Sequence, residues 1–180
     1  MKAKILLLLF FLSLSLSAQE KYYTTSGTVT FESSVPSFEQ VKATNTKVTA
    51  ILKNDGSIAS LVLTKAFRFK IALMEEHFNE NYIESEKFPK ATFSGKLVAF
   101  SMDKLTNDFK TFPLKGTLTI RGISKKIEVI AEIKKIADTV SISSLFTIAP
   151  EDFGIEIPKI VRKKISKKVG ILFTFKLEKK

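Results

Sequence analysis

The feature that most constrains the fold is an alternation of apolar and polar side chains that recurs along the chain. Residues 114–120, 127–133, 140–148 and 169–177 place an apolar residue at nearly every second position. A period of two gives a strand one apolar face, which is typical of antiparallel sheets that cover a core. Residues 54–57 (Asn-Asp-Gly-Ser) separate two further apolar runs, and Asp-Gly there favours a β-hairpin. Seven or eight such strands predict an all-β barrel or sandwich.

One segment, residues 71–83, departs from this alternation. Its apolar residues recur at steps of three and four, which places them on one face of a helix: Ile71, Met74, Phe78 and Tyr82. The sequence therefore predicts one short helical insertion in the barrel. The simplest interpretation is a helix that caps one end and packs on the core. The alternative is a lid over the mouth of a cavity.

The residues that usually perform catalysis are scarce. The 180 residues include no cysteine and a single histidine, His77, which excludes thiol nucleophiles, cysteine zinc sites and sites with two histidines. His77 and Glu80 could share a helix face, but a metal ion needs three or four ligands. Residues 152–154 (Asp-Phe-Gly) lack every other element of a kinase. We expect no enzyme activity, no metal and no cofactor.

The N-terminus has the organisation of a secretory signal peptide. Lys2 and Lys4 precede an apolar run over residues 5–16, and the small residues Ser17 and Ala18 follow. The run is shorter than the ~20 residues that span a bilayer. We expect cleavage near Ala18, with the bond after Ser17 as the alternative. This gives a signal peptide over residues 1–18, one domain over residues 19–180, and a periplasmic or secreted protein.

Positive charge is concentrated at the C-terminal end. The chain has a formal net charge of +11, and residues 159–180 hold nine basic residues against one acidic residue. Such a cluster can attract anionic lipid or phosphate groups, or simply aid solubility. Nucleic acid is not expected, because no recognised binding motif is present. The candidate contacts to a headgroup or a membrane surface are Arg162, Lys163, Lys164, Lys167 and Lys168.

Four short motifs give the chain a family resemblance. They follow one another as Gly-Thr-Val-Thr-Phe-Glu-Ser (27–33), Lys-Phe-Pro-Lys-Ala-Thr-Phe (87–93), Gly-Thr-Leu-Thr-Ile-Arg-Gly-Ile-Ser-Lys (116–125) and Asp-Phe-Gly-Ile (152–155). In this order the chain resembles the YceI-like family of exported lipid-binding proteins over most of residues 22–178. One difference is that many members carry an Arg-Asp pair early in the helical insertion, where this chain has Leu73-Met74.

The resemblance implies an extended, antiparallel, lipocalin-like β-barrel that buries a long polyisoprenoid or fatty chain. It also implies that a homodimer can form. A barrel of about eight strands can hold one small ligand, and burial contributes ~0.8 kcal/mol per CH₂ group. The expected apolar pocket residues surround the helical insertion and its flanking strands: Phe67, Phe69, Met74, Phe78, Tyr82, Phe88 and Phe93.

Two functions therefore remain open at this point. The first is a carrier of an apolar lipid with a hollow barrel. The second is a structural or interaction barrel with a filled core, which docks on an anionic membrane or a partner through its basic C-terminal end. Small residues on the apolar faces favour a cavity: Ala50, Gly116, Ala131 and Ser144.

Overall fold

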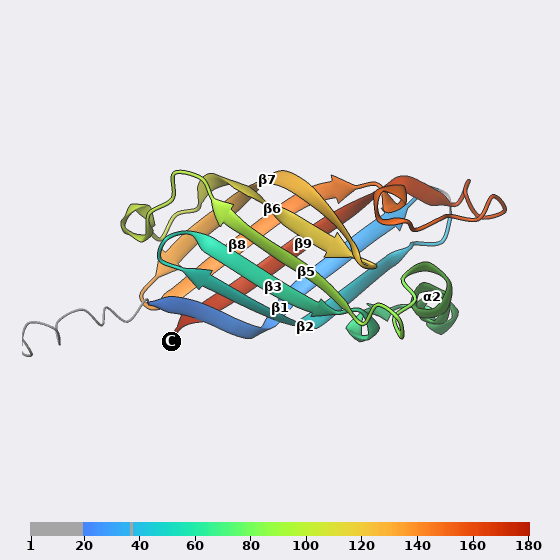
Figure 1. Cartoon of the computed structure of the whole chain (residues 1–180), viewed down its shortest axis with the longest axis horizontal. Coiled ribbons are helices and arrows are strands. Elements are labelled where there is room, and N and C mark those ends of the chain that lie inside the picture. The colour runs from blue at the N-terminus through green and yellow to red at the C-terminus, as the bar shows by residue number, and fades with distance from the viewer. Residues whose placement is uncertain (1–19, 37) are drawn as a thin grey trace, which may run out of the picture.

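The computed structural model describes residues 20–36 and 38–180, which form a closed antiparallel barrel (Figure 1). Its order is β1-β9-β8-β7-β6-β5-β3-β2, and pairing of β1 with β2 closes the ring. The strands are β1 (Lys21–Ser34), β2 (Lys42–Lys53), β3 (Ser57–Leu63), β4 (Arg68–Phe69), β5 (Lys90–Leu97), β6 (Lys110–Ile120), β7 (Ile123–Ile136), β8 (Thr139–Ile148) and β9 (Ile165–Lys179). The predicted all-β antiparallel barrel is confirmed. The predicted signal peptide lies outside the described residues.

The barrel has eight strand positions because the short strand β4 continues the line of β3. Both pair with β2, β3 through residues 49–52 and β4 through residues 43–44. A single 3₁₀ turn, Thr64–Ala66, separates them. The eight-position ring is the architecture that the alternation and the family resemblance predicted.

The predicted hairpin at residues 54–57 joins β2 to β3. Gly56 has a φ of +82°, a region that glycine enters without the steric cost of a Cβ. The Asp55 carboxylate accepts a hydrogen bond from the backbone N–H of Ser57 at 2.9 Å. The turn is thus fixed by a local side-chain contact as well as by glycine.

The helical insertion is present, but its second half is wound differently from an ordinary α-helix. An α-helix, α2 (Ala72–His77), continues directly into a π-helical turn, η2 (Phe78–Tyr82). Both are short, and no helix among the described residues has the length and apolar character that crossing a bilayer requires. Figure 1 shows this insertion at the end of the barrel opposite the C-terminus.

The two ends of the barrel are packed differently. At the end that carries both described chain termini, the inward side chains are almost fully buried and pack together: Tyr22, Leu52, Leu97, Ile133, Val140 and Leu177. Phe100 and Met102, from the connection between β5 and β6, pack against this core from outside. We call this half the filled end and the half beside α2 the open end.

The small inward residues do not leave the empty space that we expected of them. Ala50, Ala131 and Ser144 are buried, but they do not line the cavity. Gly116 pairs with Gly95 across β5 and β6, and the ring of Phe93 lies over both glycines. A Cβ at Gly116 would lie 2.5 Å from Cζ of Phe93 and 2.6 Å from the Ser94 carbonyl oxygen. The ring of Phe93 thus occupies the space beside Gly95 and Gly116.

This contact predicts that Gly116→Ala destabilises the barrel. One of the crowded atoms belongs to the backbone, so the strain cannot be relieved by a rotamer change alone. The expected loss in the free energy of unfolding is about 1–3 kcal/mol, the usual cost of overpacking, measured by urea denaturation. Gly170→Ala is the matched control, because a Cβ there would meet its nearest neighbour at 3.7 Å. Equal losses in both variants would contradict the role of the Phe93 ring.

Candidate functional site

The open end of the barrel encloses a cavity of about 390 Å³, within the range of small-molecule binding sites. Its wall is almost entirely aliphatic and aromatic. The strands β1 and β3 to β9 contribute side chains. The wall is completed by α2, η2 and the connections that follow β1, β3 and β8. A site of this composition can exclude water from an apolar ligand but offers little polar recognition.

Three side chains form the floor of the cavity. Ile58, Leu114 and Phe175 line the cavity and are ladder partners of the buried residues Leu52, Leu97 and Ile142 on the filled side. Phe175 stacks on Phe173 with ring centroids 4.9 Å apart, and Gly27 leaves room for its ring. The cavity therefore ends on tightly packed side chains about midway along the barrel.

An aromatic cluster attaches the helical insertion to the barrel. Phe78, from η2, lies 5.3 Å from Phe31, 5.7 Å from Phe67 and 5.3 Å from Phe69 between ring centroids. Such pairs contribute about 0.5–1.5 kcal/mol beyond their buried area. All four rings line the cavity, so the cluster serves both as an anchor and as part of the wall.

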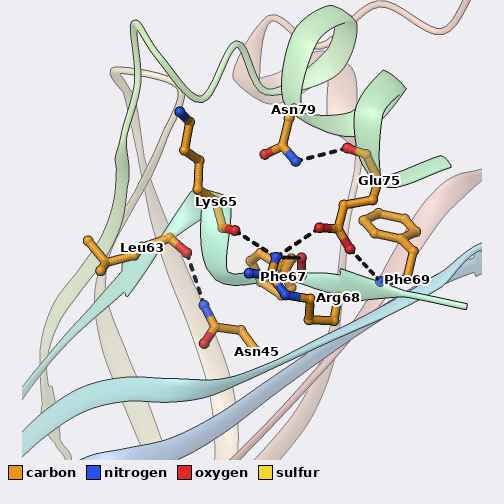
Figure 2. A network of polar contacts seen from close by, with 8 residues as sticks. All are labelled: Asn45, Leu63, Lys65, Phe67, Arg68, Phe69, Glu75 and Asn79. Atoms are coloured by element: carbon orange, nitrogen blue, oxygen red, sulfur yellow. Dashed lines mark hydrogen bonds and ion pairs between the residues drawn. The ribbon is translucent and has the colours of Figure 1, made fainter. Parts of the chain in front are cut away.

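Polar contacts of Glu75 also hold α2 over the open end (Figure 2). The Glu75 carboxylate accepts hydrogen bonds from Arg68 Nη1 at 2.8 Å and from the backbone N–H of Phe69 at 3.1 Å. Asn79 Nδ2 donates to the Glu75 carbonyl oxygen at 2.9 Å. Since β4 pairs with β2, these bonds tie the helix to the barrel wall.

Arg121 links three segments at the rim. It stands in the turn between β6 and β7 with a φ of +50°, and its guanidinium donates to the Glu84 carboxylate and the Gly154 carbonyl oxygen. Glu84 follows η2, and Gly154 follows the 3₁₀ turn η4 (Pro150–Phe153). One side chain thus fastens the helical insertion and the connection after β8 to the barrel.

Few polar groups reach the cavity. The charged or titratable ones are Glu39, Lys164 and His77 at the exposed rim, and the phenol of Tyr82 within the wall. Burial raises the pKa of Tyr82 above its ordinary value, as expected beside apolar side chains. The described residues contain no cluster of three or more groups that could hold a metal ion. This arrangement suits an apolar chain whose polar end remains at the rim.

The structure brings together six of the seven residues that the sequence suggested for the pocket. Phe67, Phe69, Met74, Phe78, Tyr82 and Phe93 all line the cavity; their contact with a ligand stays a prediction.

Phe88 is the exception, because it lies outside the cavity wall. It precedes β5, so the alternation that turns Ala91 and Phe93 inward does not extend to it. Its carbonyl oxygen accepts a hydrogen bond from Thr64 Oγ1 at 2.9 Å. Its ring packs against the turn at Gly122 and lies 5.7 Å from the Arg121 guanidinium.

Sequence reasoning missed most of the wall, which the other strands and connections supply. These residues include Val29, Phe31, Leu118, Ile120, Ile127, Val129, Phe146, Ile148, Ile171 and Phe173. Their alternation marked most of them as inward-facing. Alternation did not indicate which of these inward-facing residues lie in the half of the barrel that contains the cavity.

The five basic candidates all lie at the open end. Arg162, Lys163 and Lys164 belong to the connection between β8 and β9, and Lys167 and Lys168 begin β9 (Figure 1). All five are exposed, and Lys164 also borders the cavity. Ile160 projects from the same connection with 88% of its surface exposed. Positive charge and an exposed apolar side chain therefore flank the mouth.

Comparison with solved structures places the barrel among known folds. A polyisoprenoid-binding domain from Saccharophagus degradans aligns with a TM-score of 0.76 at 14% identity, covering 89% of this chain and 98% of that one. BcnA of Burkholderia cenocepacia aligns with a TM-score of 0.69 at 15% identity, covering 83% and 95%. The YceI protein of Campylobacter jejuni aligns with a TM-score of 0.65 at 19% identity, covering 81% and 89%. At these identities the likeness establishes the fold alone.

Sequence comparison supplies the family. None of the curated protein sequences compared with the chain matches it. The family model of the YceI-like domain matches residues 21–177, nearly the whole of the barrel. The family suggested by the four sequence motifs is therefore confirmed, and the chain belongs to the YceI-like family.

Proposed function

We propose that this protein is an exported, non-enzymatic binding protein that holds the apolar chain of a lipid, such as a polyisoprenoid or fatty chain. The observation that carries the proposal is the cavity at the open end, walled by apolar side chains from most of the strands and closed below by a packed floor. A barrel with a filled core would have side chains in this space, so the cavity favours the carrier over a purely structural role.

Apolar burial is sufficient to supply the affinity. At ~0.8 kcal/mol per CH₂ group, about ten buried groups contribute ~8 kcal/mol before the cost of association. A polar contact at the rim, for example with Lys164 or His77, can orient the lipid without dominating the binding energy. The likeness to a polyisoprenoid-binding domain supports the same class of ligand.

Export rests on the basic and apolar N-terminal segment. N-terminal sequencing of the protein recovered from outside the cytoplasm is expected to begin at or next to Gln19. Recovery of a chain that still begins at Met1 would contradict this part of the proposal.

The carrier function predicts that Phe78→Ala weakens lipid binding. The substitution removes a ring that both lines the cavity and anchors η2. The expected loss is about 1–3 kcal/mol, or roughly 5- to 150-fold in Kd. Titration with a fluorescent fatty acid measures the change, and native mass spectrometry with lipid extraction identifies the natural ligand.

Phe88→Ala is the matched control, since it removes the same ring outside the cavity wall. Its Kd is expected to stay close to that of the unmodified protein. Lipid binding that is lost equally in both variants, or in neither, would argue against the cavity as the site.

A second function, docking on an anionic membrane, is favoured by one specific observation. The connection between β8 and β9 presents Ile160 at 88% exposure beside Lys159, Arg162 and Lys163. An exposed apolar residue among basic ones is a pattern that suits the interface of an anionic bilayer. Docking at this end would bring the mouth of the cavity to the membrane.

Docking predicts that Lys163→Glu with Lys168→Glu weakens binding to phosphatidylglycerol vesicles and leaves binding of a neutral lipid in solution nearly unchanged. The difference should fade as salt rises, because exposed charges are screened. Lys53→Glu with Lys176→Glu is the control, since it makes the same charge change at the filled end. Sedimentation with vesicles measures the bound fraction of the protein. Equal losses of vesicle binding in the two double variants would contradict docking through the open end.

A further inference from the structure

The ladder of backbone hydrogen bonds between β7 and β8 covers half of β8 and about a third of β7. Residues 132–136 of β7 pair with residues 139–143 of β8 at the filled end. Ser144 follows, and its hydroxyl donates to the Ile130 carbonyl oxygen at 2.6 Å. Beyond this bond, residues 123–131 of β7 and 144–148 of β8 form no further pairs with each other. We call this interval of the barrel wall the seam.

The seam is a separation of two intact strands, because each remains paired on its other side. β7 pairs with β6 up to the turn at Arg121, and β8 pairs with β9 up to Ile148. At the rim, η4 bridges the seam through an ion pair between Asp152 and Lys125 at 3.8 Å. Both partners of this pair are about half exposed, so its contribution is small. The Arg121 hydrogen bond to the Gly154 carbonyl oxygen also spans the rim. The seam is thus closed by the ladder at the filled end and by side chains at the rim, and no ladder pairs join β7 to β8 between them.

The seam runs beside the cavity. Ile127 and Val129 line the cavity from β7, and Phe146 and Ile148 line it from β8. The two lips of the seam are therefore apolar on their inner side. An apolar chain that passes between them would leave the cavity without contact with charged side chains of the wall.

The outer surface at the seam is apolar as well. Ile130, Leu145 and Leu172 face outward from β7, β8 and β9, and they are 56%, 74% and 43% exposed. Leu145 and Leu172 are direct partners in the ladder between β8 and β9. Three large apolar side chains on adjacent strands form a patch of the type that marks an interaction surface.

We propose that the seam is a lateral portal, through which a lipid chain passes between a bilayer and the cavity while this patch contacts the bilayer. The proposal rests on the proposed lipid-binding function. A bilayer fits better than a second protein because the patch is continuous with the apolar lips and the cavity behind them. The basic connection after η4 lies at the same end, which complements anionic lipid. The axial mouth, in contrast, is covered by α2, which Glu75 ties to β4, and by the residues after η2, which the Arg121 contact with Glu84 ties to the turn before β7.

Cross-linking can test the portal cleanly, because the chain contains no cysteine. Glu128→Cys with Thr147→Cys places one thiol on each outer lip of the seam. Bridging them with a short bis-maleimide is expected to slow uptake of pyrene-labelled hexadecanoate from phosphatidylcholine–phosphatidylglycerol vesicles by about tenfold or more. Release should slow equally, so that Kd changes by less than about twofold.

Glu132→Cys with Ser143→Cys is the matched control, because these residues are already partners in the ladder. Bridging them should leave both rates unchanged. Unchanged rates after bridging the seam would overturn the portal and assign uptake to the axial mouth. If the unmodified protein takes up no lipid, the proposed function fails as well, so the two failures are distinguishable.

The contact patch has its own test in Ile130→Ser with Leu145→Ser. We expect slower uptake from vesicles and an unchanged Kd for the same probe added from solution. Ile136→Ser is the control, since Ile136 is 54% exposed on the same strand but lies at the filled end. Vesicle uptake that falls equally in both variants, or in neither, would remove the patch from the mechanism.

Discussion

The packing of inward side chains at the filled end is the interaction on which the rest of the structure depends. Each large side chain buried there contributes about 1.5–3 kcal/mol, whereas the inward side chains of the open end lack partners on the cavity side. A barrel that was hollow throughout would lose much of this stabilisation. Concentrating the core in one half lets the other half remain open, and the boundary between them is set by Ile58, Leu114 and Phe175.

The open end is held by contacts that can be broken one at a time. The Phe78 cluster, the Glu75 hydrogen bonds and the Arg121 contacts fasten the helical insertion, and the ion pair between Asp152 and Lys125 bridges the seam. Partly exposed ion pairs of this kind contribute only about 0–1 kcal/mol each. Local opening at this end should therefore cost far less free energy than unfolding the filled end. The contacts that are easiest to break therefore surround the cavity.

The open end combines the cavity with basic and exposed apolar side chains. The basic connection between β8 and β9, the projecting Ile160, the mouth and the seam all belong to the open end. The filled end carries both described chain termini and is sealed by Phe100 and Met102. If the open end faces a membrane, the lipid chain has a short apolar path into the cavity, and the filled end supplies a rigid base.

The sequence by itself determined the strands, the Asp-Gly hairpin, the helical insertion and the family, because alternation, turn residues and motifs are local signals. It also identified six residues of the cavity wall.

Only the tertiary structure decided which half of the barrel is hollow, since alternation reports the face of a strand and not its height along the barrel. Whether the interior is empty at a given height depends on the side chains of all eight strand positions at that height. Gly116, for example, leaves no void because the ring of Phe93 lies over it. Phe88 turns away because it precedes the alternating strand, and the ladder between β7 and β8 stops at Glu132 and Ser143 although both strands continue toward the open end.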